Sequence, residues 1–157
     1  ITAFLISGRV GSAMAAELGT MAVTDELDAL RVMGINPVRF LVVPRFLATL
    51  VMQPILTVYS VVIGVWGASV ISRTYLRIDP SIYYRRLYET LEMVDVQQGM
   101  AKTLVFAVII SIASCRLGLT ATGGAVGVGK ATTRSVVVAL TSILVSDYFV
   151  TRFFGID

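Results

Sequence analysis

Apolar residues occur along this chain in long stretches rather than in the short alternating runs of a soluble β domain. Three stretches, residues 46–72, 103–119 and 135–154, are long enough or nearly long enough to cross a membrane. A hydrocarbon core about 30 Å thick needs roughly 20 apolar residues in helical form. We therefore predict three membrane helices, the first of them kinked at Pro54, because proline removes a backbone donor from the helix.

The beginning of the chain carries a fourth, shorter apolar run. It stops at Ser7-Gly8-Arg9 and is too short to span a bilayer, and it lacks the basic start of a signal peptide. We interpret residues 1–7 as the end of a membrane helix whose beginning lies outside this sequence. Residues 1–157 are thus expected to form a single all-α, polytopic membrane domain that is N-terminally incomplete.

Composition supports the membrane assignment and excludes several classes of protein. Of the 157 residues, 56% are hydrophobic and 15% are charged, whereas soluble domains are roughly 25% charged. With one Cys and no His, disulfide frameworks, His-based metal sites and Ser-His or Cys-His catalysis are excluded. The formal net charge of +3 is too small and too scattered to indicate nucleic acid as a partner.

Residues 24–33 are predicted to form a short helix between two membrane helices. Thr24 is expected to cap it, and Asp25 and Glu26 would complement the helix dipole in its first turn. Gly34 provides a stop signal at the other end. The segment is therefore a helix too short to cross the membrane.

The predicted short helix is amphipathic. Leu27, Leu30 and Met33 fall on one face at helical spacing, and Asp28 and Arg31 can pair on the other. Such a helix can rest on lipid or dock on a protein. Because anionic headgroups would repel its acidic start, docking on a protein in the aqueous phase is the favoured hypothesis.

Small residues recur every fourth position in the first membrane stretch, which places them on one face of a helix. A stripe of this kind lets a second helix approach closely within a membrane. Its residues are Ser60, Gly64, Ala68 and Ser72, and a weaker stripe consists of Ala107, Ser111 and Cys115. The spacing predicts tight helix packing but does not say whether the partner belongs to the same subunit.

Asp147 is the one acidic residue within the last apolar stretch. A carboxylate at membrane depth is costly unless it is paired, protonated or in contact with water. Both a functional role and pairing inside a helix bundle fit this position. Arg152 is poorly spaced to share its helix face, so we expect a partner on another helix.

The segment from Gly118 to Arg134 contains five glycines and no acidic residue. Residues 124–131 nearly match a phosphate-binding loop, but Ala131 replaces the hydroxyl residue that would hold Mg²⁺, and no strand is expected before it. We interpret the segment as a flexible turn between two membrane helices, with its surplus glycines available for close backbone approach.

Two longer motifs resemble the MlaE-type permeases. The first joins Ala-Ala-Glu17-Leu-Gly19-Thr-Met to Thr24-Asp-Glu-Leu-Asp-Ala-Leu30 and continues to Pro37 and Pro44-Arg45; the second is Gly123-Gly-Ala-Val-Gly-Val-Gly129-Lys-Ala-Thr-Thr-Arg134. MlaE-type proteins are the membrane subunits of ABC transporters that move phospholipids between the membranes of diderm bacteria, with a counterpart in the plastid envelope. The residues at 114–116 and 123–130 resemble the cyanobacterial and plastid branch of this family more than the proteobacterial one.

The resemblance implies a second permease copy in a homodimer, cytoplasmic ABC ATPase subunits that bind ATP and Mg, and an MCE-domain lipid-binding protein on the other side. It places the protein in a bacterial inner membrane or a plastid inner envelope, and residues 8–37 and 118–134 in the cytoplasm. It makes residues 24–33 the coupling helix, with no cofactor and no catalytic site in this chain. The residues expected to couple to the ATPase are Glu17, Gly19, Thr24, Asp25, Glu26, Asp28, Leu30, Arg31 and Gly34.

Glu17 is expected to transmit movement, since an ionisable side chain next to a glycine hinge at Gly19 could exchange partners. Two other classes of function compete with the transporter hypothesis. One is a membrane scaffold or assembly subunit without transport. The other is a proton-coupled secondary carrier that uses Asp147, although the internal repeat of such carriers is not evident in the sequence.

Overall fold

The computed structural model describes residues 1–75, 77, 79–91 and 93–154, and within them the chain is helical with no strand. This confirms the all-α prediction. The elements in chain order are α1 (Thr2–Ile6), the π-helical turn η1 (Ser7–Gly11), α2 (Ser12–Val23), α3 (Glu26–Val32), the π-helical turn η2 (Val38–Val42), α4 (Val43–Thr74), α5 (Pro80–Thr90), α6 (Met93–Leu119) and α7 (Gly124–Phe154).

The first three elements form one continuous helix. Ser7, Gly11 and Ser12 at their junctions all have right-handed helical dihedral angles. The prediction that a helix ends at residue 7 is therefore wrong, because the helix continues through the glycines to Val23. Glycine lowers helix propensity by only about 1 kcal/mol relative to alanine, and the packing described below favours a small residue at Gly11.

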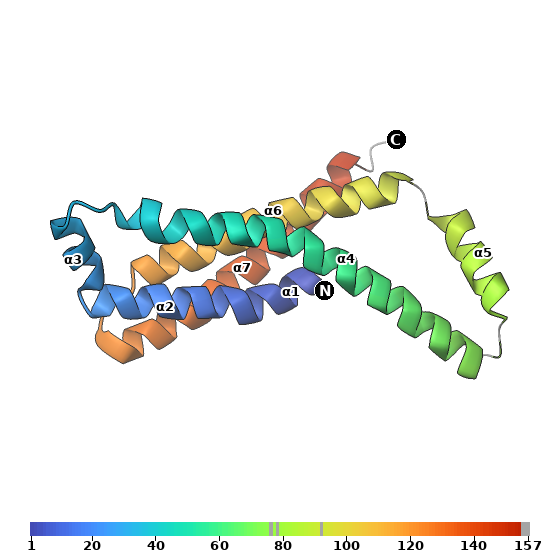
Figure 1. Cartoon of the computed structure of the whole chain (residues 1–157), viewed down its shortest axis with the longest axis horizontal. Helices are drawn as coiled ribbons and strands as arrows, with labels where there is room; N and C mark the ends of the chain where they lie inside the picture. Colours follow the sequence, from blue (N-terminus) through green and yellow to red (C-terminus); the bar gives the residue numbers. More distant parts are fainter. Residues whose placement is uncertain (76, 78, 92, 155–157) are drawn as a thin grey trace.

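Among the described residues, three helical segments are long and apolar enough to cross a membrane, as predicted from the sequence. They are Val38–Thr74, Met93–Leu119 and Gly124–Phe153, and each begins earlier than the apolar stretch that indicated it. The polar residues that precede those stretches are thus helical too. Figure 1 shows that α4, which contains Pro54, changes direction near its middle, as expected for a proline inside a helix.

The helices form a bundle with two unlike ends (Figure 1). In the bundle α2, α6 and α7 pack against one another and α4 packs on α6, while α3 lies across one end. At the opposite end the second half of α4 diverges from the bundle and carries α5 beside it, where the Tyr83 hydroxyl donates to the Val65 carbonyl at 3.3 Å. Asp79 caps α5, and the bonds that it accepts from Ser81 hold the pKa of its carboxyl below the ordinary value.

The tightest packing joins α2 to α6 through residues with little or no side chain. A Cβ atom added at Gly118 would lie 2.8 Å from the Leu18 Cβ and 2.9 Å from the Ala15 carbonyl oxygen. One added at Gly11 would lie 2.9 Å from the Ser114 Oγ. Ala15, Leu18 and Ser114 are fully buried. The two backbones can approach this closely because their contact positions are small.

The two predicted stripes of small residues have different surroundings. The weaker stripe is buried, with Ala107, Ser111 and Cys115 at most 2% exposed. In the stronger stripe Ser72 is buried, whereas Ser60, Gly64 and Ala68 are exposed within this chain. A Cβ at Gly64 would meet no atom within 4 Å. Packing of that stripe against another subunit therefore stays a prediction.

The α2–α6 contact predicts that Gly118→Ala destabilises the protein. The new methyl group would meet the backbone of Ala15 and the stiff Cβ of Leu18, so the helices must move apart, at a cost of about 1–3 kcal/mol. Thermal unfolding of the purified protein in detergent measures the loss. Gly67→Ala is the matched control, because its Cβ has open space; equal melting temperatures for both variants would contradict the prediction.

Candidate functional site

The helix α3 begins at a left-handed residue and not at the predicted threonine cap. Asp25 precedes α3 with φ of 60°, a conformation that aspartate adopts more readily than most residues. The Thr24 hydroxyl donates to the Thr20 carbonyl at 2.9 Å and so belongs to the end of α2. The predicted capping role of Thr24 is therefore wrong. Thr24 ends α2, and its bond to the carbonyl four residues earlier is one that helical threonines commonly make.

The other end of α3 is closed by Gly34, as predicted. Gly34 has φ of 76°, its N–H donates to the Arg31 carbonyl at 3.0 Å, and the Ile35 N–H donates to the Leu30 carbonyl at 2.9 Å. These two bonds form a Schellman motif, which satisfies the last carbonyls of a helix. The boundaries of α3 are thus fixed on both sides by residues with positive φ.

α3 buries one apolar residue and exposes its charges. Leu27 is buried and Leu30 is partly buried, while Met33 is exposed although it was predicted on the same face. Asp25, Glu26 and Asp28 are all exposed, and Asp28 pairs with Arg31 at 2.7 Å as the spacing predicted. The solvent side of α3 therefore combines carboxylates with the exposed side chains of Val32 and Met33.

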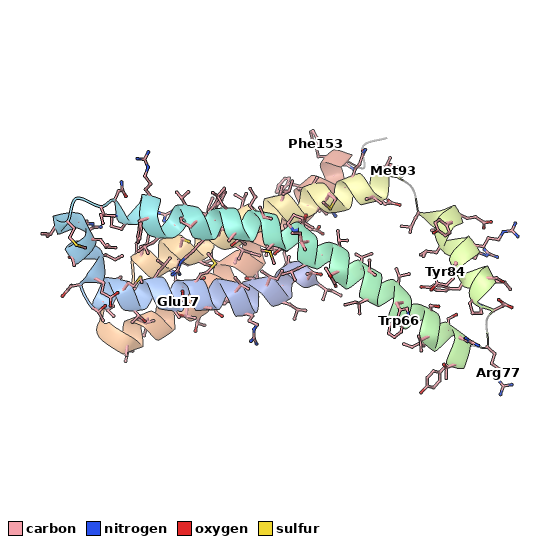
Figure 2. The ribbon with its side chains drawn as sticks, in the orientation of Figure 1. Glu17, Trp66, Arg77, Tyr84, Met93 and Phe153 are labelled. Atoms are coloured by element: carbon pink, nitrogen blue, oxygen red, sulfur yellow. The ribbon has the colours of Figure 1, made fainter. Side chains whose placement is uncertain are left out.

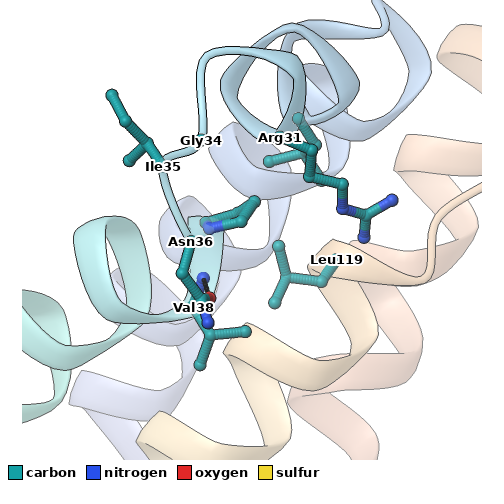
Figure 3. A pocket seen from close by; sticks show the side chains of 8 residues that line it. Arg31, Gly34, Ile35, Asn36, Val38 and Leu119 are labelled. Carbon is teal, nitrogen blue, oxygen red and sulfur yellow. Dashed lines mark hydrogen bonds between the residues drawn. The ribbon is translucent and has the colours of Figure 1, made fainter.

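A pocket of about 380 Å³ lies between α3, the following loop and the end of α6. Figure 3 shows Arg31 and Leu119 near one another at this pocket, with Ile35 pointing away from Leu119. Asn36 accepts a bond from the Val38 N–H at 3.0 Å and so starts the next helical segment. The pocket is a small hollow beside α3, lined by both polar and apolar groups.

Glu17 forms an ion pair that joins α2 to α4. Its carboxylate lies 2.9 Å from Nη2 of Arg45, whose side chain is 23% exposed against 64% for Glu17 (Figure 2). The other terminal nitrogen of Arg45 is buried without a partner among the described residues. Replacing Glu17 would therefore leave a largely buried guanidinium unpaired, which is costly in a low-dielectric environment.

Gly19 is a packing residue within α2 and not a hinge. It lies inside the continuous helix, and a Cβ there would meet Val128 Cγ1 at 3.3 Å and Ala121 Cβ at 3.4 Å. The hinge interpretation is therefore wrong: the absence of a side chain lets α7 and the loop before it approach α2.

Asp147 pairs with a residue of another helix, as predicted. Its carboxylate lies 2.9 Å from the Lys102 ammonium, which also donates to the Thr151 hydroxyl at 2.7 Å. The pair joins α6 to α7, with Lys102 largely covered and Asp147 half exposed. The cost of a carboxylate at this depth is thus offset within the chain.

The glycine-rich segment before Arg134 is mostly helical, so its interpretation as a long flexible turn is wrong. Residues 120–123 alone connect α6 to α7, and Gly123 and Gly124 have φ of 90° and 65°. A Cβ at Gly127 would overlap the Thr122 carbonyl, because the turn folds back over the first turn of α7. Of the five glycines, Gly118 and Gly127 serve close backbone approach, and Gly123 and Gly124 adopt positive φ in the turn.

Three residues that form these contacts were not predicted as site residues from the sequence. Arg45 was predicted only as part of a family motif, Gly118 only as one of five glycines, and Lys102 was not among the predicted residues. A cation next to an apolar stretch is a signal for a partner across the bundle. The identity of that partner depends on helix register, which spacing within one helix does not provide.

Comparisons with known proteins relate this chain to membrane permeases. A sequence model described as "Permease MlaE" matches residues 1–153. A probable ABC transporter permease protein of Synechocystis sp. is 48% identical over 149 residues, which cover 95% of this chain and 57% of that protein. The protein TRIGALACTOSYLDIACYLGLYCEROL 1, chloroplastic, of Arabidopsis thaliana is 40% identical over 154 residues, which cover 98% of this chain and 44% of that protein.

A third relative is a probable ABC transporter permease protein of Rickettsia typhi, 39% identical over 152 residues, which cover 97% of this chain and 59% of that protein. The chain thus spans about half the length of the curated relatives it matches.

The Lys102–Asp147 contact predicts a favourable coupling energy between α6 and α7. In a double-mutant cycle of Lys102→Gln and Asp147→Asn, we expect a coupling of about 1 kcal/mol, because Lys102 is largely covered. Thermal unfolding of the four proteins in detergent measures it. The exposed Arg85–Glu89 pair on α5 is the matched control, with an expected coupling of about 0.3 kcal/mol. Equal coupling in both cycles would refute the prediction.

Proposed function

Because the chain belongs to the MlaE permease family, we propose that it is the permease subunit of an ABC transporter that moves phospholipids or related lipids between membranes. The chain itself performs no covalent chemistry. ATP and Mg are bound by partner ATPase subunits, whose movements alternately open a lipid cavity at the interface of two permease copies.

The observation that carries this proposal is the short helix α3 at one end of the bundle. It is exposed on its acidic side, connects directly to α2 and leads through η2 into α4 (Figure 1). A partner that binds α3 can thus act on two membrane helices at once. Charged and apolar groups together on one exposed surface suit a protein interface. We assign α3 as the coupling helix, docked on a cytoplasmic ATPase.

Other features support the remaining parts of the proposal. The exposed stripe Ser60, Gly64 and Ala68 offers a surface on which a second copy can pack closely. The Arabidopsis relative is named after trigalactosyldiacylglycerol, a glycolipid, which supports a lipid as cargo. The end that carries α5 faces away from α3 and is available to an MCE-domain protein on the other side of an inner membrane or plastid envelope.

The Glu17–Arg45 pair is the proposed link between α3 and the lipid cavity. It joins α2 and α4, the helices that enter and leave the α3 segment. Glu17 is mostly exposed while Arg45 is mostly covered, so the carboxylate is the member free to change partners. Breaking and re-forming this contact would let α2 and α4 separate when α3 is displaced.

Reversing the charge of the α3 surface tests the coupling assignment. We expect the triple change Asp25→Lys, Glu26→Lys and Asp28→Lys to abolish recovery of the ATPase in a pull-down with the complete permease, because like charges would then meet across the interface. The matched control reverses Asp79, Glu89 and Asp95 at the far end. Full ATPase recovery by the α3 variant would overturn the assignment.

Changing Glu17 tests transport apart from assembly. Glu17→Lys places two cations together and is expected to abolish lipid transfer from reconstituted liposomes while the ATPase stays bound. The exchange of both charges, Glu17→Arg with Arg45→Glu, should restore part of the flux. Unchanged flux in Glu17→Lys would refute this role. Flux without any ATPase would favour a carrier, and normal assembly without flux in the wild type would favour a scaffold.

A further inference from the structure

A groove of about 590 Å³ lies between α6 and α7, lined by residues of these two helices and the turn between them. Most of its lining is apolar and includes Val108, Ile112 and Val138, of which Ile112 is 55% exposed and Val138 is 39% exposed. Two arginines, Arg116 and Arg134, also line it. The groove therefore combines an apolar floor with two guanidinium groups.

The two arginines lie at the same end of the groove. α6 and α7 are linked by a hydrogen bond of 3.1 Å between Ser135 and Ser114, which places their neighbours Arg134 and Arg116 at one level of the bundle. From Arg116 to Val108 the groove follows about 12 Å of helix, at 1.5 Å per residue. It thus runs from a cationic end into the apolar part of the bundle.

The positive charge at this end is not neutralised within the described part of the chain. Neither Arg116 nor Arg134 has a side-chain hydrogen bond or ion pair with a described residue, and both are exposed. Lys130 lies one turn before Arg134 and lines a neighbouring hollow with it. From residue 96 to residue 146 the sequence contains no acidic residue. Three cations are therefore available to an external anion.

The depth of the arginines matches the boundary of a membrane. Residues 103–115 and 135–146 are uncharged, and the arginines stand at one border of these stretches while the Lys102–Asp147 pair stands at the other. This border is the one toward α3 (Figure 1). Guanidinium groups there meet lipid headgroups, and the groove beside them lies in the hydrocarbon region.

We propose that the groove between α6 and α7 binds an anionic phospholipid of the surrounding leaflet, with its phosphate held by Arg116 and Arg134 and an acyl chain along Val108, Ile112 and Val138. Guanidinium groups match phosphate oxygens in charge and geometry. A headgroup of net negative charge is preferred over a zwitterionic one, because a zwitterion brings its own cation toward three unpaired ones. The lipid would be a resident of this groove and not transported cargo, so the inference does not depend on the proposed transport function.

Native mass spectrometry of the complete protein in detergent tests the site with two probes, phosphatidylglycerol and phosphatidylcholine of the same acyl chains. The wild type should retain phosphatidylglycerol in preference. Arg116→Gln with Arg134→Gln should reduce that retention by about fivefold for each arginine, the contribution of one basic group near a membrane surface. The matched control Arg9→Gln with Arg39→Gln removes the same charge from exposed positions outside the groove and should retain the preference.

A third variant distinguishes a lipid from free phosphate. Ala113→Phe fills the apolar part of the groove and leaves both arginines in place, so it should also lower phosphatidylglycerol retention. Undiminished retention in this variant, together with displacement of the probe by inorganic phosphate, would overturn the lipid site. Equal retention of the two lipids by the wild type would overturn it too.

Discussion

The close approach of α2 and α6 is the constraint on which the rest of the bundle depends. Gly118 faces Ala15 and Leu18 without room for a methyl group, and Gly11 faces Ser114 in the same way. Within lipid, helices gain little from the hydrophobic effect when they associate, so dispersion contacts between near backbones must hold them. This contact fixes the axis of α2, and α7 then packs on both helices. The position of α3 at the end of α2 follows from it.

How far the sequence predicts this structure depends on the range of the interactions involved. Features set by neighbouring residues were predictable: the three apolar spans, the Gly34 stop and the Asp28–Arg31 pair. The beginning of α7 was not, since five glycines argue locally for a turn, whereas the segment is helical and packs on α2, with Val128 next to Gly19. The role of Thr24 was also mispredicted, since its hydroxyl bonds the Thr20 carbonyl of α2, as helical threonines commonly do, and Asp25 is the residue that precedes α3. The candidate site was located by its acidic helix, but its cross-helix ion pairs required the register of the helices.

The few charged residues of the bundle form cross-helix ion pairs near both of its ends. Glu17 and Arg45 connect helices near the α3 end, and Lys102 and Asp147 connect helices near the other end. Both pairs join segments that are far apart in the sequence, so each acts as a cross-link between helices and not as local helix support. Among the other cations, Arg116, Lys130 and Arg134 have no side-chain partner among the described residues and can meet groups from outside the chain.

The two positive-φ residues that border α3 have a mechanical consequence. Because Asp25 and Gly34 hold tight, directional turns in place of extended loops, the segment contains little slack in which a push on α3 could be absorbed. In the proposed coupling role of α3, a displacement of this helix would therefore be passed on to the ends of α2 and η2. Flexible residues inserted at either turn would let α3 move without moving α2 or η2, while every contact surface stays unchanged.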